Sequence, residues 1–244
     1  MISCDFNRIS SILHASIQGA ASASLGIHEL CYDSRKVVNP ASCLFIAIKT
    51  DRNNGHKYIP DLIRLGVKHF LVQETPSNDM LSEASFIVVE NTLSALQNLA
   101  QHHRAELNIP VIGITGSNGK TIVKEWLFQC LNSIYTIARS PRSYNSQIGV
   151  ALSILPIEKQ QNLAIIEAGI SLPGEMDTLQ QMIQPNLGIF TNMRSAHAEN
   201  FASAAHHIQE KMKLFAQVET LVCSSAYPEI IREAKNQNIP LFTW

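Results

Sequence analysis

The feature that most constrains this chain is a regular alternation of apolar runs and amphipathic segments that begins after Pro110. The apolar runs predict strands at residues 111–115, 134–138, 163–168, 187–191 and 221–224. The amphipathic segments predict helices at residues 120–131, 147–155, 173–183 and 202–216, and a last apolar segment follows at residues 240–244. Because strands joined through helices follow right-handed crossovers, this order predicts an α/β fold with a mostly parallel sheet. Ligands of such a sheet bind at the carboxyl ends of its strands.

A smaller α/β unit is predicted before this alternation begins. Residues 43–48 and 86–89 are typical of buried strands, and residues 58–65 and 93–107 place their apolar side chains at helical spacing. The pattern changes near residue 108. The sequence therefore predicts two domains, residues 1–107 and residues 108–244.

Composition limits the classes of function that remain. The 244 residues are 45% hydrophobic and 16% charged, which is typical of a folded protein. The 19 Lys and Arg residues and the 20 Asp and Glu residues leave a net charge of −1, which excludes the basic surface of a general nucleic-acid binder. The longest plain apolar run, residues 44–48, is far shorter than the roughly 20 residues that a membrane span needs. The five cysteines are widely spaced and odd in number, so we expect reduced thiols and a cytoplasmic protein.

The strongest candidate site is a glycine-rich segment between a predicted strand and a predicted helix. It consists of Gly113, Ile114, Thr115, Gly116, Ser117, Asn118, Gly119, Lys120 and Thr121. Glycines allow a tight turn that directs backbone N–H groups at phosphate oxygens, and the helix N-terminus adds partial positive charge. Lys120 can reach the terminal phosphates, and Thr121 offers a hydroxyl group to Mg²⁺. The general pattern has glycine where Ile114 stands, but the Gly-Lys-Thr core favours nucleotide binding over a turn without function.

Two further residues are candidates for metal chemistry, and each has a plainer alternative. Glu167 ends a predicted strand at the edge where the glycine-rich loop should lie, so it fits either a Mg²⁺ ligand or a solvated acid, and the loop favours the metal. His197 follows another strand and can offer an imidazole to a divalent ion, although a single loop histidine is more often a surface residue. Lys211 is typical of a solvated helical lysine. The histidine pairs at residues 102–103 and 206–207 are predicted to be surface residues, because adjacent helical residues point in different directions.

Several motifs together resemble the ATP-dependent Mur ligases of peptidoglycan synthesis. The loop ending in Lys120-Thr121, followed by Lys124-Glu125, resembles the phosphate loop of that family, which also accounts for Ile114. The other matching segments are residues 33–35, 44–47, 54–56, 144–150, 167–169, 173–175, 191–192, 196–197 and 201–203. The block formed by residues 167–169 and 173–175 favours the branch of the family that adds D-Ala-D-Ala over its sister ligases and over folylpolyglutamate synthases.

This resemblance implies a role for each candidate residue. Gly116, Ser117, Asn118, Gly119 and Lys120 would hold the phosphates of ATP, Thr121 and Glu167 a first Mg²⁺, and His197 a second. Lys211 falls where the family carries a carbamylated lysine, so Lys120, His197 and Lys211 would be the catalytic residues. Asp33, Ser34 and Arg35 would bind the uridine nucleotide, and Asn145 would face the substrate.

The resemblance also implies a reaction. The ATP γ-phosphoryl group would pass to the carboxylate of UDP-MurNAc-tripeptide, and the amine of D-Ala-D-Ala would attack the resulting acyl phosphate. The family has a third, C-terminal domain that these 244 residues do not contain, so we expect a truncated central domain and an inactive isolated chain. The N-terminal motifs also resemble a subgroup in which an alanine racemase is fused behind the ligase.

Two other functions remain open from the sequence. The chain could bind only nucleotide or the UDP-linked precursor without turnover, or it could be a phosphate-loop kinase or NTPase of small metabolites. Phosphate release with UDP-MurNAc-tripeptide, measured with and without D-Ala-D-Ala, would separate the three functions.

Overall fold

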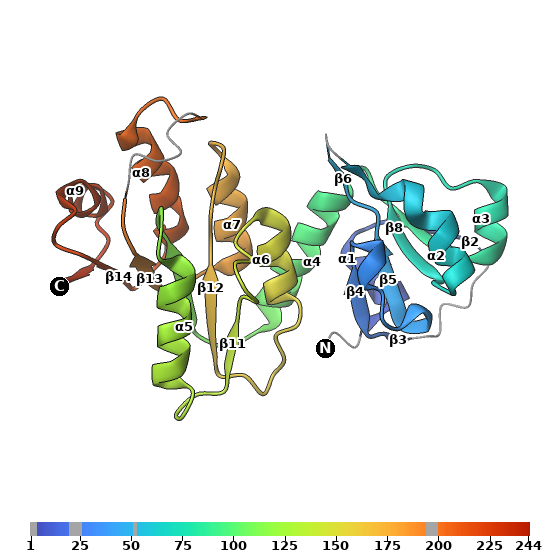
Figure 1. The fold of residues 1–244 in the computed structure, drawn as a ribbon, viewed down its shortest axis with the longest axis horizontal. Helices are drawn as coiled ribbons and strands as arrows, with labels where there is room; N and C mark the ends of the chain where they lie inside the picture. The colour runs from blue at the N-terminus through green and yellow to red at the C-terminus, as the bar shows by residue number, and fades with distance from the viewer. Residues whose placement is uncertain (1–3, 20–25, 51–52, 194–199) are drawn as a thin grey trace. The chain divides into compact units, whose positions relative to one another are not determined.

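The computed structural model describes residues 4–19, 26–50, 53–193 and 200–244. The chain divides into two compact units, Met1–His102 and His103–Trp244 (Figure 1). The predicted domain boundary after residue 107 stays a prediction.

The first unit is built on a five-stranded sheet with the strand order β2-β9-β8-β5-β4. These strands are β2 (Ile17–Gly19), β9 (Ser85–Val88), β8 (His69–Val72), β5 (Cys43–Ile46) and β4 (Glu29–Cys31). Only β2 runs antiparallel to its neighbour in this sheet. The two minor sheets pair β1 (Cys4–Asp5) with β3 (Gly26–Ile27) and β6 (Lys49–Thr50) with β7 (Asn53–Asn54).

Helices and an aromatic core complete the first unit. The helices are α1 (Phe6–Ile12), α2 (Ile59–Leu65), α3 (Asn78–Glu83) and the short 3-10 helices η1 (Ser34–Lys36), η2 (Pro40–Ser42) and η3 (Gly55–Tyr58). Helix α4 (Thr92–Glu106) begins in this unit and ends in the second. Phe45, Phe70 and Phe86 lie on neighbouring strands and are fully buried. The Phe70 and Phe86 rings stack with their centroids 5.2 Å apart. These side chains anchor the sheet because aromatic residues bury more apolar area than other residues.

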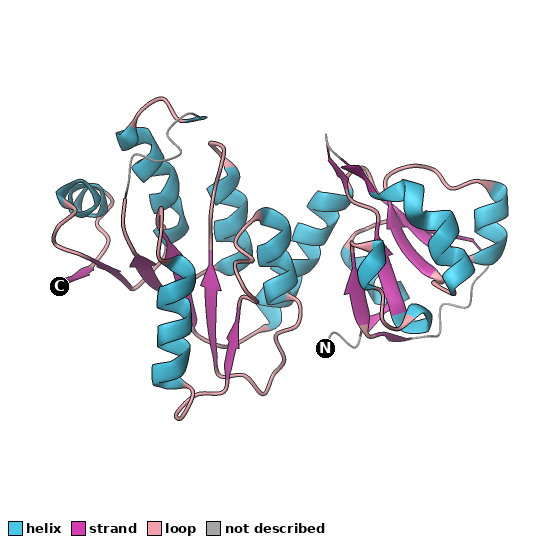
Figure 2. Ribbon diagram, in the orientation of Figure 1, coloured by secondary structure: helices cyan, strands magenta, loops and turns pink. Residues whose placement is uncertain are grey.

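The second unit has a six-stranded sheet in which every pairing is parallel, with the order β11-β12-β10-β13-β14-β15. The strands are β10 (Val111–Thr115), β11 (Ile137–Arg139), β12 (Leu163–Glu167), β13 (Leu187–Phe190), β14 (Thr220–Cys223) and β15 (Leu241–Thr243). The helices are α5 (Lys120–Leu131), α6 (Gln147–Ile154), α7 (Glu175–Ile183), α8 (Ala204–Met212), the 3-10 helix η5 (Lys213–Phe215) and α9 (Pro228–Asn236). The predicted α/β fold with a mostly parallel sheet is therefore confirmed (Figure 2).

Helices cover both faces of this sheet. Ile114, Ile165 and Ile189 pack with Val123 and Leu127 of α5 on one face. Gly188 points to the opposite face, because successive residues of a strand alternate. A Cβ at Gly188 would lie 2.4 Å from the Phe215 ring, so η5 packs directly against the backbone there.

Two predicted elements begin later than expected, for local reasons. The strand predicted at residues 134–138 begins at Ile137, because Ile134 still donates its N–H group to the Leu131 carbonyl and is 72% exposed. The helix predicted at residues 173–183 begins at Glu175, because Gly174 has a φ of +83° and cannot take part in a right-handed helix.

Within the second unit, a buried arginine fastens the last turn of α4 to the end of α7. The Arg104 guanidinium is 7% exposed and donates to the carbonyls of Leu107, Ile183 and Gln184 at 2.9–3.0 Å. The last carbonyls of a helix carry partial negative charge and lack partners inside the helix, so a cation is favourable at this position.

Within the described parts of the chain, no helix is long and apolar enough to cross a membrane.

We expect Arg104→Met to lower the free energy of unfolding by about 2–3 kcal/mol, because it leaves three carbonyls without their charged donor. Urea denaturation followed by circular dichroism measures the loss. Arg232→Met, which changes an exposed arginine of α9, serves as the control and should be neutral. Equal stability of the two variants would contradict the assigned role of Arg104.

Candidate nucleotide and metal site

The glycine-rich loop connects β10 to α5 at the carboxyl edge of the central sheet. Gly116 and Gly119 have φ angles of +141° and +81°, in the region that favours glycine. A Cβ at Gly116 would lie 2.1 Å from the Thr191 hydroxyl oxygen. The loop therefore requires glycine at residue 116 both for its backbone conformation and for its close approach to Thr191.

The residues that follow β13 hold this loop in place. The N–H groups of Ser117 and Asn118 donate to the backbone oxygen and to Oδ1 of Asn192, both at 3.0 Å. The Thr191 hydroxyl donates to the Asn118 carbonyl at 2.6 Å. Two of the loop N–H groups expected to bind phosphate are thus engaged here, and the first turn of α5 supplies N–H groups that have no partner inside the helix. Thr191 and Asn192 were not among the predicted site residues, although their place after a predicted strand is a signal that could have indicated them.

Two lysines converge on one carbonyl of the loop. Lys120 Nζ donates to the Gly116 carbonyl at 2.8 Å, and Lys211 Nζ reaches the same oxygen at 3.5 Å. Lys211 is 3% exposed, so it is not the solvated helical lysine that its sequence context suggests. Burial, with a smaller contribution from the charge of Lys120, lowers the pKa of Lys211 to about 8. Burial also lowers the pKa of Lys120, and the Glu167 carboxylate opposes that shift.

Glu167 and Thr121 form the part of the site that fits a divalent cation. The Thr121 hydroxyl donates to Glu167 Oε2 at 2.9 Å. Oε1 of the fully buried Glu167 accepts no hydrogen bond from any described residue. Burial raises the pKa of Glu167, while the Thr121 hydroxyl and the nearby lysines oppose the rise. A buried carboxylate oxygen without a hydrogen bond, next to a hydroxyl group, is a donor set that suits Mg²⁺.

Described residues alone do not form a complete metal cage. Across the ranges that the structure describes, no three His, Cys, Asp or Glu side chains gather in a group that could hold a metal ion. This agrees with the chemistry of Mg²⁺, which usually binds one or two carboxylates and completes its shell with waters and substrate phosphates.

A pocket of about 310 Å³ brings several predicted residues together. Gly116, Ser117, Lys120, Asn145 and Lys211 all line it. Asn145 is held there by its backbone carbonyl, which accepts the Gly169 N–H group at 2.8 Å. The predicted substrate residue Asn145 therefore lies in the same pocket as the phosphate-loop lysine.

The two histidine predictions in this region have different outcomes. His197 lies outside the described residues, so its role as a metal ligand stays a prediction. The prediction that His207 is a surface residue is wrong. His207 is 2% exposed, stacks on Phe201 with ring centroids 4.0 Å apart, and lines the pocket. The amphipathic helix α8 places His207 in the interior. Because histidine is a polar residue, the sequence did not indicate this burial.

The predicted uridine-nucleotide residues lie in the first unit. Asp33 caps η1 and accepts two hydrogen bonds at 2.9 Å from the Arg35 guanidinium. These bonds are the main reason that the pKa of Asp33 is lowered to about 2. The Arg35 side chain is 85% exposed, so its charge remains accessible to an anionic ligand.

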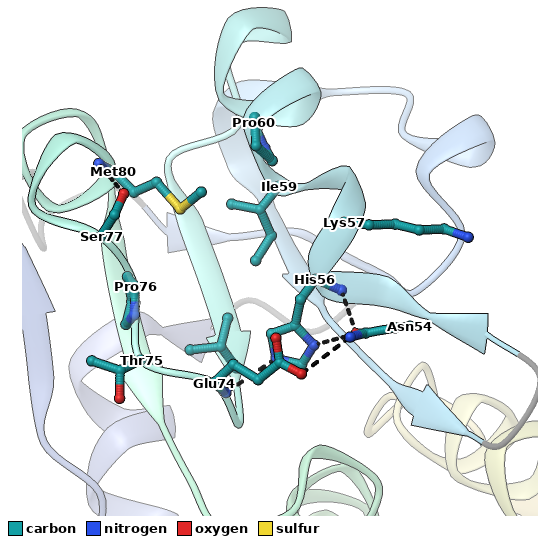
Figure 3. A pocket seen from close by; sticks show the side chains of 11 residues that line it. Asn54, His56, Lys57, Ile59, Pro60, Glu74, Thr75, Pro76, Ser77 and Met80 are labelled. Atoms are coloured by element: carbon teal, nitrogen blue, oxygen red, sulfur yellow. Dashed lines mark hydrogen bonds between the residues drawn. The ribbon is translucent and has the colours of Figure 1, made fainter.

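The first unit has a pocket of its own, of about 440 Å³, and His56 lines it (Figure 3). His56 Nε2 lies 3.0 Å from the Gln73 N–H nitrogen and 3.3 Å from that of Glu74, and accepts from both. Its Nδ1 therefore carries the proton and donates to Asn54 Oδ1 at 2.7 Å. Burial lowers the pKa of His56, which favours this neutral form. The histidine joins the segment before α2 to the end of β8.

Comparison with known proteins agrees with the geometry of the site. The Mur ligase middle domain matches residues 114–244, and the catalytic domain of the Mur ligase family matches residues 26–114. The chain belongs to the Mur ligase family. The UDP-N-acetylmuramoyl-tripeptide–D-alanyl-D-alanine ligase of Bacillus subtilis is 32% identical over 188 residues, which cover 77% of this chain and 40% of that protein. The same-named ligase of Buchnera aphidicola subsp. Acyrthosiphon pisum is 28% identical over 249 residues, which cover 100% of this chain and 53% of that protein.

Solved Mur ligase structures share the fold. MurF from Acinetobacter baumannii is 22% identical with a TM-score of 0.87, over 97% of this chain and 52% of that chain. MurF ligase from Thermotoga maritima, in complex with ADP, is 25% identical with a TM-score of 0.77, over 88% of this chain and 49% of that chain. This Mur ligase chain thus spans about half the length of the relatives that it matches.

The depressed pKa of Lys211 predicts a pH-dependent stability. Between about pH 8 and the ordinary lysine value of 10.5, the unfolded chain binds more protons than the folded chain, so stability rises with pH. We expect the melting temperature of the wild type, relative to Lys211→Met, to rise across this window in buffer depleted of CO₂. Lys235→Met, an exposed substitution on α9, should show no such trend. Parallel curves for the wild type and Lys211→Met would refute the prediction.

Proposed function

We propose that this chain is the nucleotide- and precursor-binding part of a ligase that adds D-Ala-D-Ala to UDP-MurNAc-tripeptide at the expense of ATP. The pocket carries the proposal, because Lys120, Lys211 and Asn145 line it together. The Thr121–Glu167 pair is fixed beside the phosphate loop. The names of the relatives support the same substrates, and the ADP complex of the Thermotoga maritima ligase supports an adenine nucleotide.

The residues of the second unit have distinct proposed roles. Lys120, Gly116, Gly119 and the first turn of α5 bind the phosphates of ATP, while Ser117 and Asn118 shape the loop through their N–H bonds to Asn192. Thr121 and Glu167 hold a Mg²⁺ ion, which when bound neutralises charge on the phosphoryl oxygens. Asn145 orients the substrate in the pocket.

Lys211 has a chemistry that depends on its buried environment. A pKa of about 8 leaves a substantial neutral fraction of the amine near physiological pH. A neutral amine can add to CO₂ and release a proton, which yields a carbamate. The resulting anion, together with His197, would support a second metal ion.

The first unit supplies the proposed anchor for the UDP moiety. Asp33, Ser34 and Arg35 form a capped turn whose exposed guanidinium suits a diphosphate. In the whole ligase, the tripeptide carboxylate would accept the γ-phosphoryl group, and the amine of D-Ala-D-Ala would displace phosphate from the acyl phosphate. The fused alanine racemase stays a prediction.

We expect Lys120→Ala to weaken binding of an ATP analogue with Mg²⁺ by at least about tenfold, because a charged donor to phosphate is lost. Lys211→Ala should weaken it far less in this chain, because its carbamate would act through the second metal of the assembled active site. Isothermal titration calorimetry measures both affinities. Equal losses would contradict this order.

The 244-residue chain should bind UDP-MurNAc-tripeptide without completing the ligation. Positioning two reactants is worth roughly 7–11 kcal/mol of the barrier, and the chain spans only part of the relatives that perform the reaction. Calorimetry with UDP-MurNAc-tripeptide measures the binding. Mass spectrometry after incubation with ATP, Mg²⁺ and D-Ala-D-Ala detects any product. Absence of binding would refute the precursor-binding role, and catalytic formation of pentapeptide would refute the predicted inactivity.

A further inference from the structure

Lys124 is the only described residue of α5 that is buried, and its side chain is fully inaccessible to solvent. It lies one turn after Lys120, on the helix that begins at the phosphate loop. A buried ammonium group is costly, whereas a methionine of similar length would bury its side chain at little cost. The position therefore calls for an explanation beyond packing.

The ammonium group of Lys124 is held by neighbours from two segments, residues 140–142 and α5 itself. It donates to the Ser140 carbonyl at 2.7 Å and to the Arg142 carbonyl. It also pairs with Glu125 Oε1 at 3.2 Å. An ammonium group has three hydrogens, and the two carbonyls take two of them.

The same ammonium group faces the proposed metal carboxylate. Lys124 Nζ lies 3.8 Å from Glu167 Oε1, the oxygen that accepts no hydrogen bond from a described residue. Oε2 of the same carboxylate is fixed by Thr121. The attraction of Lys124 therefore holds Oε1 electrostatically and leaves its lone pairs available to another ligand.

We propose that Lys124 is a positioning residue that fixes the Glu167 carboxylate for Mg²⁺, an inference that rests on the proposed function. Its two carbonyl partners belong to the segment of residues 140–145, which ends at Asn145 in the pocket. The ammonium group of Lys124, which lies on α5, thus contacts both the Glu167 carboxylate and the segment that leads to Asn145. Lys124 belongs to the motif that resembles the phosphate loop of the family, but the sequence alone predicts no role for it.

The test separates metal-dependent binding from folding. ADP affinity of the 244-residue chain is measured by calorimetry with Mg²⁺ and, separately, with EDTA, for the wild type and Lys124→Met. Removal of a group that holds a metal ligand in place costs about 10- to 100-fold in metal affinity. We expect Lys124→Met to lose about 10- to 100-fold of the gain in ADP affinity that Mg²⁺ provides, and to keep its metal-free ADP affinity.

Three further variants make the test specific. Lys213→Met removes a lysine that pairs with Asp177 and Glu210, and it should keep the full Mg²⁺-dependent gain. Lys124→Gln can still donate to a carbonyl while it removes the charge, so it provides the test if Lys124→Met does not fold. In a Glu167→Gln background, Lys124→Met should cause no further loss of the gain, because its action passes through that carboxylate.

An unchanged Mg²⁺-dependent gain in a folded Lys124 variant would overturn the inference. A loss of equal size with and without Mg²⁺ would also overturn it, since that result indicates a purely structural role. Failure of the wild type to bind ADP under any condition would overturn the proposed function itself and this inference with it.

Discussion

Parallel pairing of β10 with both β12 and β13 is the constraint on which the site depends. Ile114 lies opposite Glu167 in one register and opposite Ile189 in the other, while Thr115 lies opposite Phe190. Because all three strands run in the same direction, their carboxyl ends meet at one edge of the sheet. This pairing places the phosphate loop, the metal carboxylate and the Thr191-Asn192 segment next to one another.

Several charged side chains at this edge of the sheet are buried from solvent. Lys124, Glu167 and Lys211 are each 3% exposed or less. Each buried group then requires either a specific partner or a shifted pKa, because water cannot screen its charge. Carbonyls hold Lys124, a hydroxyl group holds Glu167 Oε2, and Lys211 adapts through a lowered pKa. These charges are preorganised to interact with an anionic nucleotide and a divalent cation.

The parts of the site that depend on local pattern could be predicted from the sequence. The Gly-Lys-Thr core lies between a strand and a helix, and Glu167 ends a neighbouring strand, as the alternation of the second unit required. Burial and long-range contact could not be predicted in this way. Lys211 and His207 have polar side chains on an amphipathic helix, and only tertiary contacts bury them: His207 stacks on Phe201, and Lys211 lies against the Gly116 carbonyl. The hydrogen bond from the Asn118 N–H group to Asn192 holds the loop, and it joins residues more than 70 positions apart in the sequence.

The sequence by itself determined the α/β class, the place of the phosphate loop and the family, because these depend on periodicity and on short motifs of fixed spacing. Only the tertiary structure decided which side chains share the pocket, which glycine contacts Thr191, and which lysine faces the free oxygen of Glu167. Those features depend on the register of parallel strands and on the burial of charge, and neither quantity is encoded in any single stretch of residues.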